Sequence, residues 1–181
     1  MITAFLGELY VNPFEILDLF TYSETRYENG AKLAGIIYVH RISDFRMSGS
    51  SGRNFKLLCN LCGDDALKNN VIVTNMWGEV DHMRGEMREA QLRNKFFNQA
   101  IDKGAKLLRH DNTVESAQKV LLEVIYNTPL PLRIQIELVD EQLKLVETAA
   151  GVELNREILE ATRKHEAEIN QLLVEMEGKV G

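Results

Sequence analysis

A β-branched apolar run near the middle of the chain constrains the fold more than any other feature. Residues 70–77 (NVIVTNMW) pass from valine and isoleucine to polar and aromatic residues and are followed by Gly78. Such a run is typical of a buried strand that leads into a loop at the edge of a sheet. Ligands of open α/β sheets bind outside the carboxyl ends of the strands, so a site is expected first at residues 74–79. A core strand that ends in an ordinary turn fits the periodicity equally well.

Two more strands are predicted, one on each side of this run along the chain. Residues 33–40 (LAGIIYVH) are apolar at successive positions, which indicates a central parallel strand, and residues 105–109 (AKLLR) form a short third candidate. Helical patterns are predicted at residues 13–29, 53–62 and 81–103 and after residue 112. Because strands that alternate with helices form parallel βαβ units, we predict an α/β fold. It has a partial parallel sheet of about three strands flanked by helices, followed by a long C-terminal helix.

Two of these helices also carry expectations for the core. Met83 and Met87 are expected to fill gaps in it. Asn112 and Glu115 fit a capping box for the helix that follows the third strand. Its apolar stripe is predicted to consist of Val114, Ala117, Val120, Leu121, Val124 and Ile125.

Charge and hydropathy exclude two classes of partner. The net charge of −6 argues against nucleic acid, because phosphate binding depends on clustered Lys and Arg. No apolar run approaches the roughly 20 residues that a membrane span needs, and the N-terminus has no basic segment before an apolar block. We therefore expect a soluble, cytoplasmic protein without a membrane span.

Pro129 and Pro131 mark a predicted boundary between residues 1–129, the α/β domain, and residues 130–181, a long acidic helix. Residues 131–181 hold eleven Asp and Glu against six Lys and Arg, so this segment carries −5 of the net charge. Apolar residues recur there every seven positions, at Leu138, Leu145, Val152 and Leu159. The pattern fits a weak coiled coil, which implies self-association or a protein partner, or a helix packed partly on the domain.

The cysteines and histidines give weaker signals. Cys59 and Cys62 lie near the end of a predicted helix, where the helix dipole disfavours a thiolate, so buried structural thiols are predicted. His40, Asp44 and His110 follow two of the strands and are the residues of a possible acid/base enzyme. Polar residues after a strand are more often simply part of a turn.

Several phrases of the chain resemble one known family when they are taken together. They are residues 32–47 (KLAGIIYVHRISDFRM), 61–69 (LCGDDALKN), 71–80 (VIVTNMWGEV), 109–113 (RHDNT) and 148–151 (TAAG). In this order they resemble the C-terminal half of a fungal group of P-loop GTPases related to the AIG1-type, septin and chloroplast-import GTPases, over roughly residues 16–177. The resemblance implies a G domain that binds GTP with Mg²⁺. It also implies that the nucleotide base is bound by Thr74, Asn75, Met76 and Trp77, with Arg109 and His110 opposite.

Two departures from the family limit this expectation. The 181 residues contain neither a Gly-Lys-Ser/Thr phosphate loop nor an Asp-x-x-Gly motif. Trp77 also stands where the family carries the Asp that reads guanine, and Asn75 and Glu79 are weaker substitutes. We therefore expect a truncated or degenerate GTP-binding protein that keeps the base-side wall and does not hydrolyse GTP alone. The alternative is a non-catalytic interaction or scaffold protein that acts through its C-terminal coiled coil.

The missing half leads to a last expectation. Without its usual neighbour, the strand at residues 33–40 is expected to leave an open edge and an exposed apolar patch along Ile36 and Tyr38. A domain of this kind would be only marginally stable, unless the apolar N-terminal residues cover part of the patch.

Overall fold

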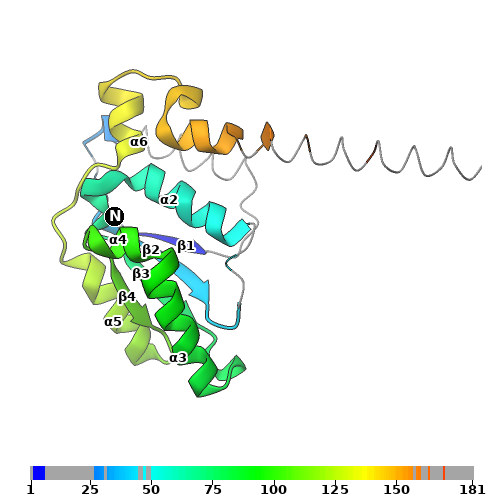
Figure 1. The fold of residues 1–181 in the computed structure, drawn as a ribbon. Helices are drawn as coiled ribbons and strands as arrows, with labels where there is room; N and C mark the ends of the chain where they lie inside the picture. The colour runs from blue at the N-terminus through cyan, green and yellow to red at the C-terminus, as the bar shows by residue number, and fades with distance from the viewer. Residues whose placement is uncertain are drawn as a thin grey trace, which may run out of the picture.

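Four parallel strands form one sheet in the order β1-β2-β3-β4 (Figure 1). The structure is a computed structural model, and it describes residues 2–6, 27–30, 32–44, 47, 50–156, 158–159, 163 and 169. The strands are β1 (Ile2–Leu6), β2 (Gly35–Arg41), β3 (Val71–Asn75) and β4 (Lys106–Arg109). The three strands predicted from the sequence are thus present and parallel, and β1 is an additional strand that the sequence analysis did not identify.

The helices follow the predicted order with several internal breaks. They are α2 (Ser50–Leu67), α3 (His82–Gln91), α4 (Asn98–Asp102), α5 (Val114–Ile125) and α6 (Arg133–Gln135). Gly63 interrupts α2 with a φ of 69°, and a π-helical turn at Leu92–Phe96 separates α3 from α4. Gly104, with a φ of 98°, ends the region predicted as one helix over residues 81–103. The helix predicted over residues 13–29 lies outside the described residues, apart from its last few.

The two faces of the sheet carry separate apolar clusters because side chains alternate along a strand. Tyr38 and Ile72 face α2 and α4, where the rings of Phe55 and Phe97 lie 5.1 and 6.1 Å from the ring of Tyr38. The opposite face packs against α5 through Ile37, Val71, Val73, Val120 and Val124. Burial on both faces is the reason that these strands read as continuous apolar runs.

The expectation of an open edge beside β2 is wrong. The backbone of β1 pairs in parallel with β2, from Ile2 opposite Gly35 to Leu6 opposite Val39. The predicted patch is also buried, because Ile36 is 5% exposed and Tyr38 is 0% exposed beneath α2. Gly35 permits the backbone just before β3 to approach β2 closely, since a Cβ atom at this position would lie 2.0 Å from the carbonyl oxygen of Asn69.

The side-chain expectations for α3 and α5 need correction. Met83 and Met87 are exposed and do not fill the core. The N-cap of α5 is Thr113 and not Asn112, because the Thr113 hydroxyl accepts a hydrogen bond from the backbone N–H of Ser116. The buried residues of α5 are Ser116, Val120 and Val124, whereas Val114, Leu121 and Ile125 of the predicted stripe are exposed.

The two cysteines are thiols, as predicted, with Cys62 buried and Cys59 half-buried. Burial raises the pKa of Cys62 to about 12 and that of Cys59 to about 11. Asn70, just before β3, donates its side-chain amide to the Cys62 sulfur at 3.0 Å. Both thiols therefore stay protonated and serve the packing of α2.

A single long helix is not seen after residue 130. The helical segments Arg133–Gln135 and Ile136–Asp140 follow each other directly, and irregular backbone at residues 141–144, in which Gln142 has a φ of 55°, separates them from Leu145–Glu147. Ile134 and Ala150 are buried in the cluster that includes α2, so this part of the chain packs on the α/β layer. Beyond residue 156 only residues 158–159, 163 and 169 are described, and the rest of the predicted coiled coil lies outside them. None of the described helices combines the length and the apolar character that crossing a bilayer requires.

Candidate functional site

A row of three polar side chains crosses the carboxyl end of the sheet on the face covered by α3. The register places His40 of β2 opposite Thr74 of β3, and Thr74 opposite Arg109 of β4. His40 and Thr74 alternate in phase with Tyr38 and Ile72, so they belong to the same face. The sheet therefore brings residues from three separate parts of the sequence into one line.

The loop after β3 carries Trp77 across this row. Met76 adopts a left-handed conformation, with a φ of 57°, and the chain then enters a 3-10 helix at Trp77–Glu79. The indole Nε1–H donates to the carbonyl oxygen of Thr74 at 3.1 Å and lies 3.2 Å from its hydroxyl oxygen. Thr74 is 0% exposed, so it holds Trp77 in place and does not face solvent.

Arg109 and Trp77 form a stacked pair at the end of β4. The guanidinium carbon of Arg109 lies over the indole at 4.2 Å from the ring centroid. The Nε and Nη2 atoms of this guanidinium both donate hydrogen bonds to the carboxylate of Glu89 on α3, the first at 2.9 Å. These bonds raise the pKa of Arg109. Gly85 leaves room for the indole, because a Cβ atom there would lie 2.9 Å from a carbon of the Trp77 ring. The ring is thus fixed between β4 and α3.

Hydrogen bonds join the loops after β2 and β3. Arg41 pairs with Glu79 at 2.8 Å, and the Ser43 hydroxyl donates to the same carboxylate at 2.9 Å. These contacts lower the pKa of Glu79. The backbone N–H of Ile42 donates to the carbonyl oxygen of Asn75 at 3.0 Å. The side-chain oxygen of Asn75 is buried, and none of the described residues donates a hydrogen bond to it.

The loop after β4 is braced against β3 and α5. The backbone N–H of His110 donates to the carbonyl oxygen of Thr74 at 2.8 Å, and its Nδ1 lies 2.7 Å from the Ser116 hydroxyl. Hydrogen bonds from Ser116 and Thr113 lower the pKa of Asp111 to about 2. The predicted base-side residues are therefore gathered at one edge of the sheet, although His110 bonds toward α5.

The side chain of His40 is completely buried. It is 0% exposed and packs edge-on against the Phe97 ring at 5.7 Å, and neither ring nitrogen has a hydrogen-bond partner among the residues that the structure describes. Burial and the nearby charge of Arg88 lower its pKa to about 4, against the opposing effect of Asp44. His40 is consequently a neutral imidazole at pH 7, whereas His110 is bonded to Ser116. The two histidines postulated for acid/base chemistry thus occupy different environments.

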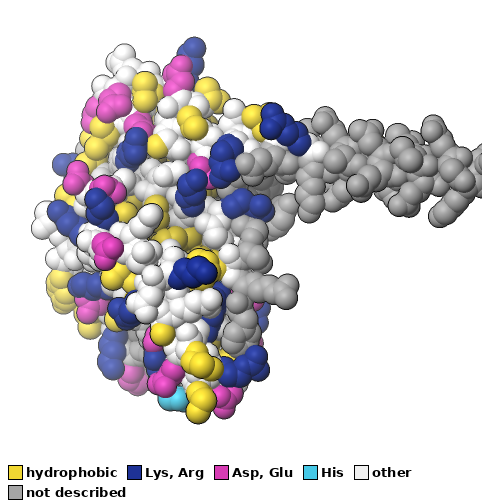
Figure 2. All heavy atoms as spheres, viewed as in Figure 1, with side chains coloured by type: hydrophobic (Ala, Val, Ile, Leu, Met, Phe, Trp, Pro, Cys, Tyr) yellow, Lys and Arg dark blue, Asp and Glu magenta, His cyan; other side chains and the backbone are white. Residues whose placement is uncertain are grey.

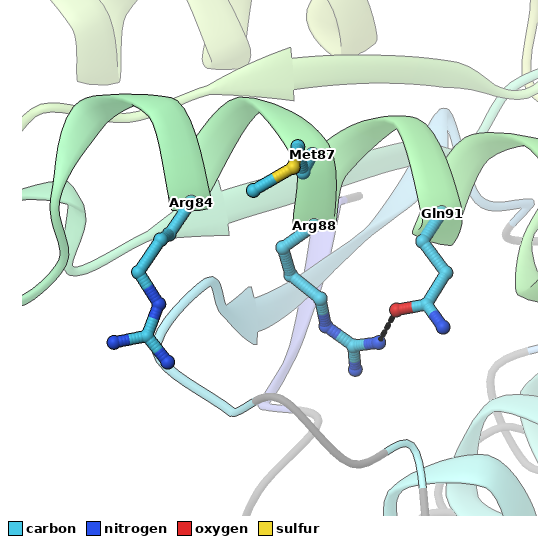
Figure 3. A pocket seen from close by; sticks show the side chains of 4 residues that line it. All are labelled: Arg84, Met87, Arg88 and Gln91. Atoms are coloured by element: carbon cyan, nitrogen blue, oxygen red, sulfur yellow. Dashed lines mark hydrogen bonds between the residues drawn. The ribbon is translucent and has the colours of Figure 1, made fainter.

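The sequence analysis missed a second group of residues on α3. Arg84, Met87, Arg88 and Gln91 line a cavity of about 310 Å³ (Figure 3). Their spacing of three and four residues puts them on one side of a helix, which is the signal that was available. It was not decisive, because basic residues on a helix usually mark its solvated side. Among the described residues, no group of three or more His, Cys, Asp or Glu side chains forms a possible metal site.

Comparisons with known proteins do not assign the chain to a family. No protein-family model and no curated protein matches it. The parallel α/β fold is consistent with a Rossmann-like or P-loop-like domain, and the argument for function rests on the site itself.

The burial of neutral His40 predicts a pH dependence of stability. The unfolded state binds a proton near pH 6.5 and the folded state near pH 4, so stability falls as the pH drops below 6.5. We expect a loss of about 2 kcal/mol in the free energy of unfolding between pH 7.5 and pH 5.0. Urea denaturation at the two pH values measures it.

The control compares two histidine variants. His40→Gln should remove most of the difference between the two pH values, whereas His82→Gln, at a side chain that is 79% exposed, should leave it unchanged. Equal pH dependence in the wild type and His40→Gln would show that another group is responsible.

Proposed function

We propose that this chain is a nucleotide-binding α/β domain that keeps the base-side wall of a G domain and does not hydrolyse GTP on its own. The observation that supports this most directly is the stacked pair of Trp77 and Arg109 at the carboxyl edge of a parallel sheet. Such a pair presents a flat, cationic surface, and a planar nucleobase stacks favourably on surfaces of this kind.

The surroundings of the pair suit a purine base. The Arg109 side chain is 43% exposed, so its outer side is accessible while Glu89 fixes its orientation. Asn75 and Met76 are half-buried beside Trp77, and the ionised carboxylate of Glu79 is an acceptor for base N–H groups. Thr74 is a supporting residue in this proposal, because it is buried and contacts Trp77.

Turnover is not part of this proposal. Phosphoryl transfer depends on positioning the phosphates and on metal electrostatics, and the 181 residues contain neither of the family's motifs for these tasks. GTP and Mg²⁺ enter only through the resemblance. A cytoplasmic location also stays a prediction.

The single tryptophan allows a direct test of base binding. Trp77 is the only Trp in the chain, so its fluorescence reports on the proposed surface without interference. We expect guanosine monophosphate and GTP to quench it to a similar extent and with similar affinity, because the proposal includes no phosphate loop. No release of inorganic phosphate from GTP should exceed a buffer control.

Two variants make this test specific. Arg109→Lys removes the planar guanidinium and should weaken binding about tenfold, while Arg93→Lys at an exposed position should not. Absence of any saturable quench, or Mg²⁺-dependent GTP turnover by the purified chain, would contradict the proposal.

A second function, self-association through the C-terminal region, rests on a different observation. Val152 and Leu159 lie seven residues apart in helical backbone and are 55% and 51% exposed. The start of this helical segment is fixed to the domain, because Glu153 is buried and pairs with Lys56 at 2.9 Å. An anchored helix with exposed apolar side chains seven residues apart favours pairing with a second copy.

Light scattering tests the association. The full chain should show a mass that rises toward a dimer with concentration, and the double variant Val152→Glu with Leu159→Glu should stay a monomer. Asn155→Glu adds a single negative charge at an exposed position of the same helix and should associate like the wild type. A wild-type monomer at every concentration would exclude this second function.

A further inference from the structure

Arg88 of α3 combines burial with an unused hydrogen-bonding edge. The residue is 3% exposed, and its Nη1 donates to the Gln91 side-chain oxygen at 2.6 Å. Its Nε and Nη2 atoms are buried, and no described residue forms a hydrogen bond with them. These two nitrogens form one side of the planar guanidinium, whose parallel N–H groups match the two oxygens of a carboxylate or phosphate.

Arg109 shows how the protein satisfies the same edge elsewhere. Its Nε and Nη2 atoms both donate to the carboxylate of Glu89. Arg88 lies one residue before Glu89 on α3, and within the described part of the chain it has no acidic hydrogen-bond partner. Leaving a buried charged donor unsatisfied is costly, so the edge of Arg88 is suited to an oxyanion from outside the chain.

The cavity beside Arg88 has the charge and shape that this requires. It is an open cavity of about 310 Å³, and Arg84, Arg88 and Gln91 project from the same side of α3 (Figure 3). Burial lowers the pKa of Arg88 and the charge of Asp44 opposes the shift, but a guanidinium stays protonated at neutral pH. His40, whose ring lies close enough to Arg88 for the two to interact, is neutral and adds no charge.

We propose that this α3 cavity binds a small oxyanion, the phosphate or carboxylate group of a small molecule, on the Nε and Nη2 edge of Arg88. Of the other described residues that line the cavity, Arg84 and Gln91 are polar and Met87 is apolar. The site is separate from the stacked pair of Trp77 and Arg109, so it does not depend on the proposed nucleotide function.

Calorimetric titration of the full chain with inorganic phosphate and with acetate, at constant ionic strength, tests the proposal. We expect saturable binding of at least one of the two anions at one site per chain. Tighter phosphate binding identifies a phosphate-bearing ligand, and tighter acetate binding identifies a carboxylate. No saturable binding of either anion would overturn the proposal.

Three variants locate the site. Arg88→Gln should weaken binding at least about tenfold, because two charge-assisted hydrogen bonds are lost. Arg84→Gln, at an exposed lining residue, should weaken it severalfold. Arg93→Gln removes an exposed charge from the following π-helical turn and should have no effect. Equal weakening of anion binding by Arg84→Gln and Arg93→Gln would show that only the net charge of the protein matters and would overturn the proposal.

Discussion

The register of β2, β3 and β4 determines which side chains reach α3. Side chains alternate between the faces of a strand, so burial of Tyr38 and Ile72 beneath α2 and α4 places His40 and Thr74 on the same face. A slip of one residue would send these polar groups toward α5 and expose the aromatic core. Packing of the core and composition of the site are therefore two results of one constraint.

The polar groups at and near this edge of the sheet differ in whether they have hydrogen-bond partners. Arg109, Glu79 and Asp111 have charged or hydroxyl partners, whereas His40 and Arg88 are buried with unsatisfied nitrogens. Over the face seen in Figure 2, side chains of both signs are interspersed, so recognition here depends on local geometry and not on a broad field. Unsatisfied groups inside such a surface mark the positions where an external ligand has the most to contribute.

The sequence predicted the parts of the fold that depend on local pattern. The runs at β2 and β3 are apolar enough to identify buried parallel strands, and Gly104 ends its helix as expected. The features that depend on tertiary packing were not predicted from the sequence.

The N-terminal residues show no clear period, so the pairing of β1 with β2 could not be predicted from them. Leu138 and Leu145 fit a heptad, yet both pack against the cluster beneath α2, and the chain bends between them. The site was predicted as loops after strands, but the contributions of Arg88 and Gln91 needed the geometry of α3.

In the proposed base-binding function, the nucleotide base binds at the carboxyl edge of the sheet, on the side of α3. Two-dimensional ¹H–¹⁵N spectra of the full chain, titrated with guanosine monophosphate, test this because they report on the Trp77 indole N–H and on the backbone amides around it separately. The largest shift changes are expected at the Trp77 indole N–H and at the backbone amides of residues 75–78. Changes confined to α5 or to residues 130–156, or none at millimolar ligand, would contradict it.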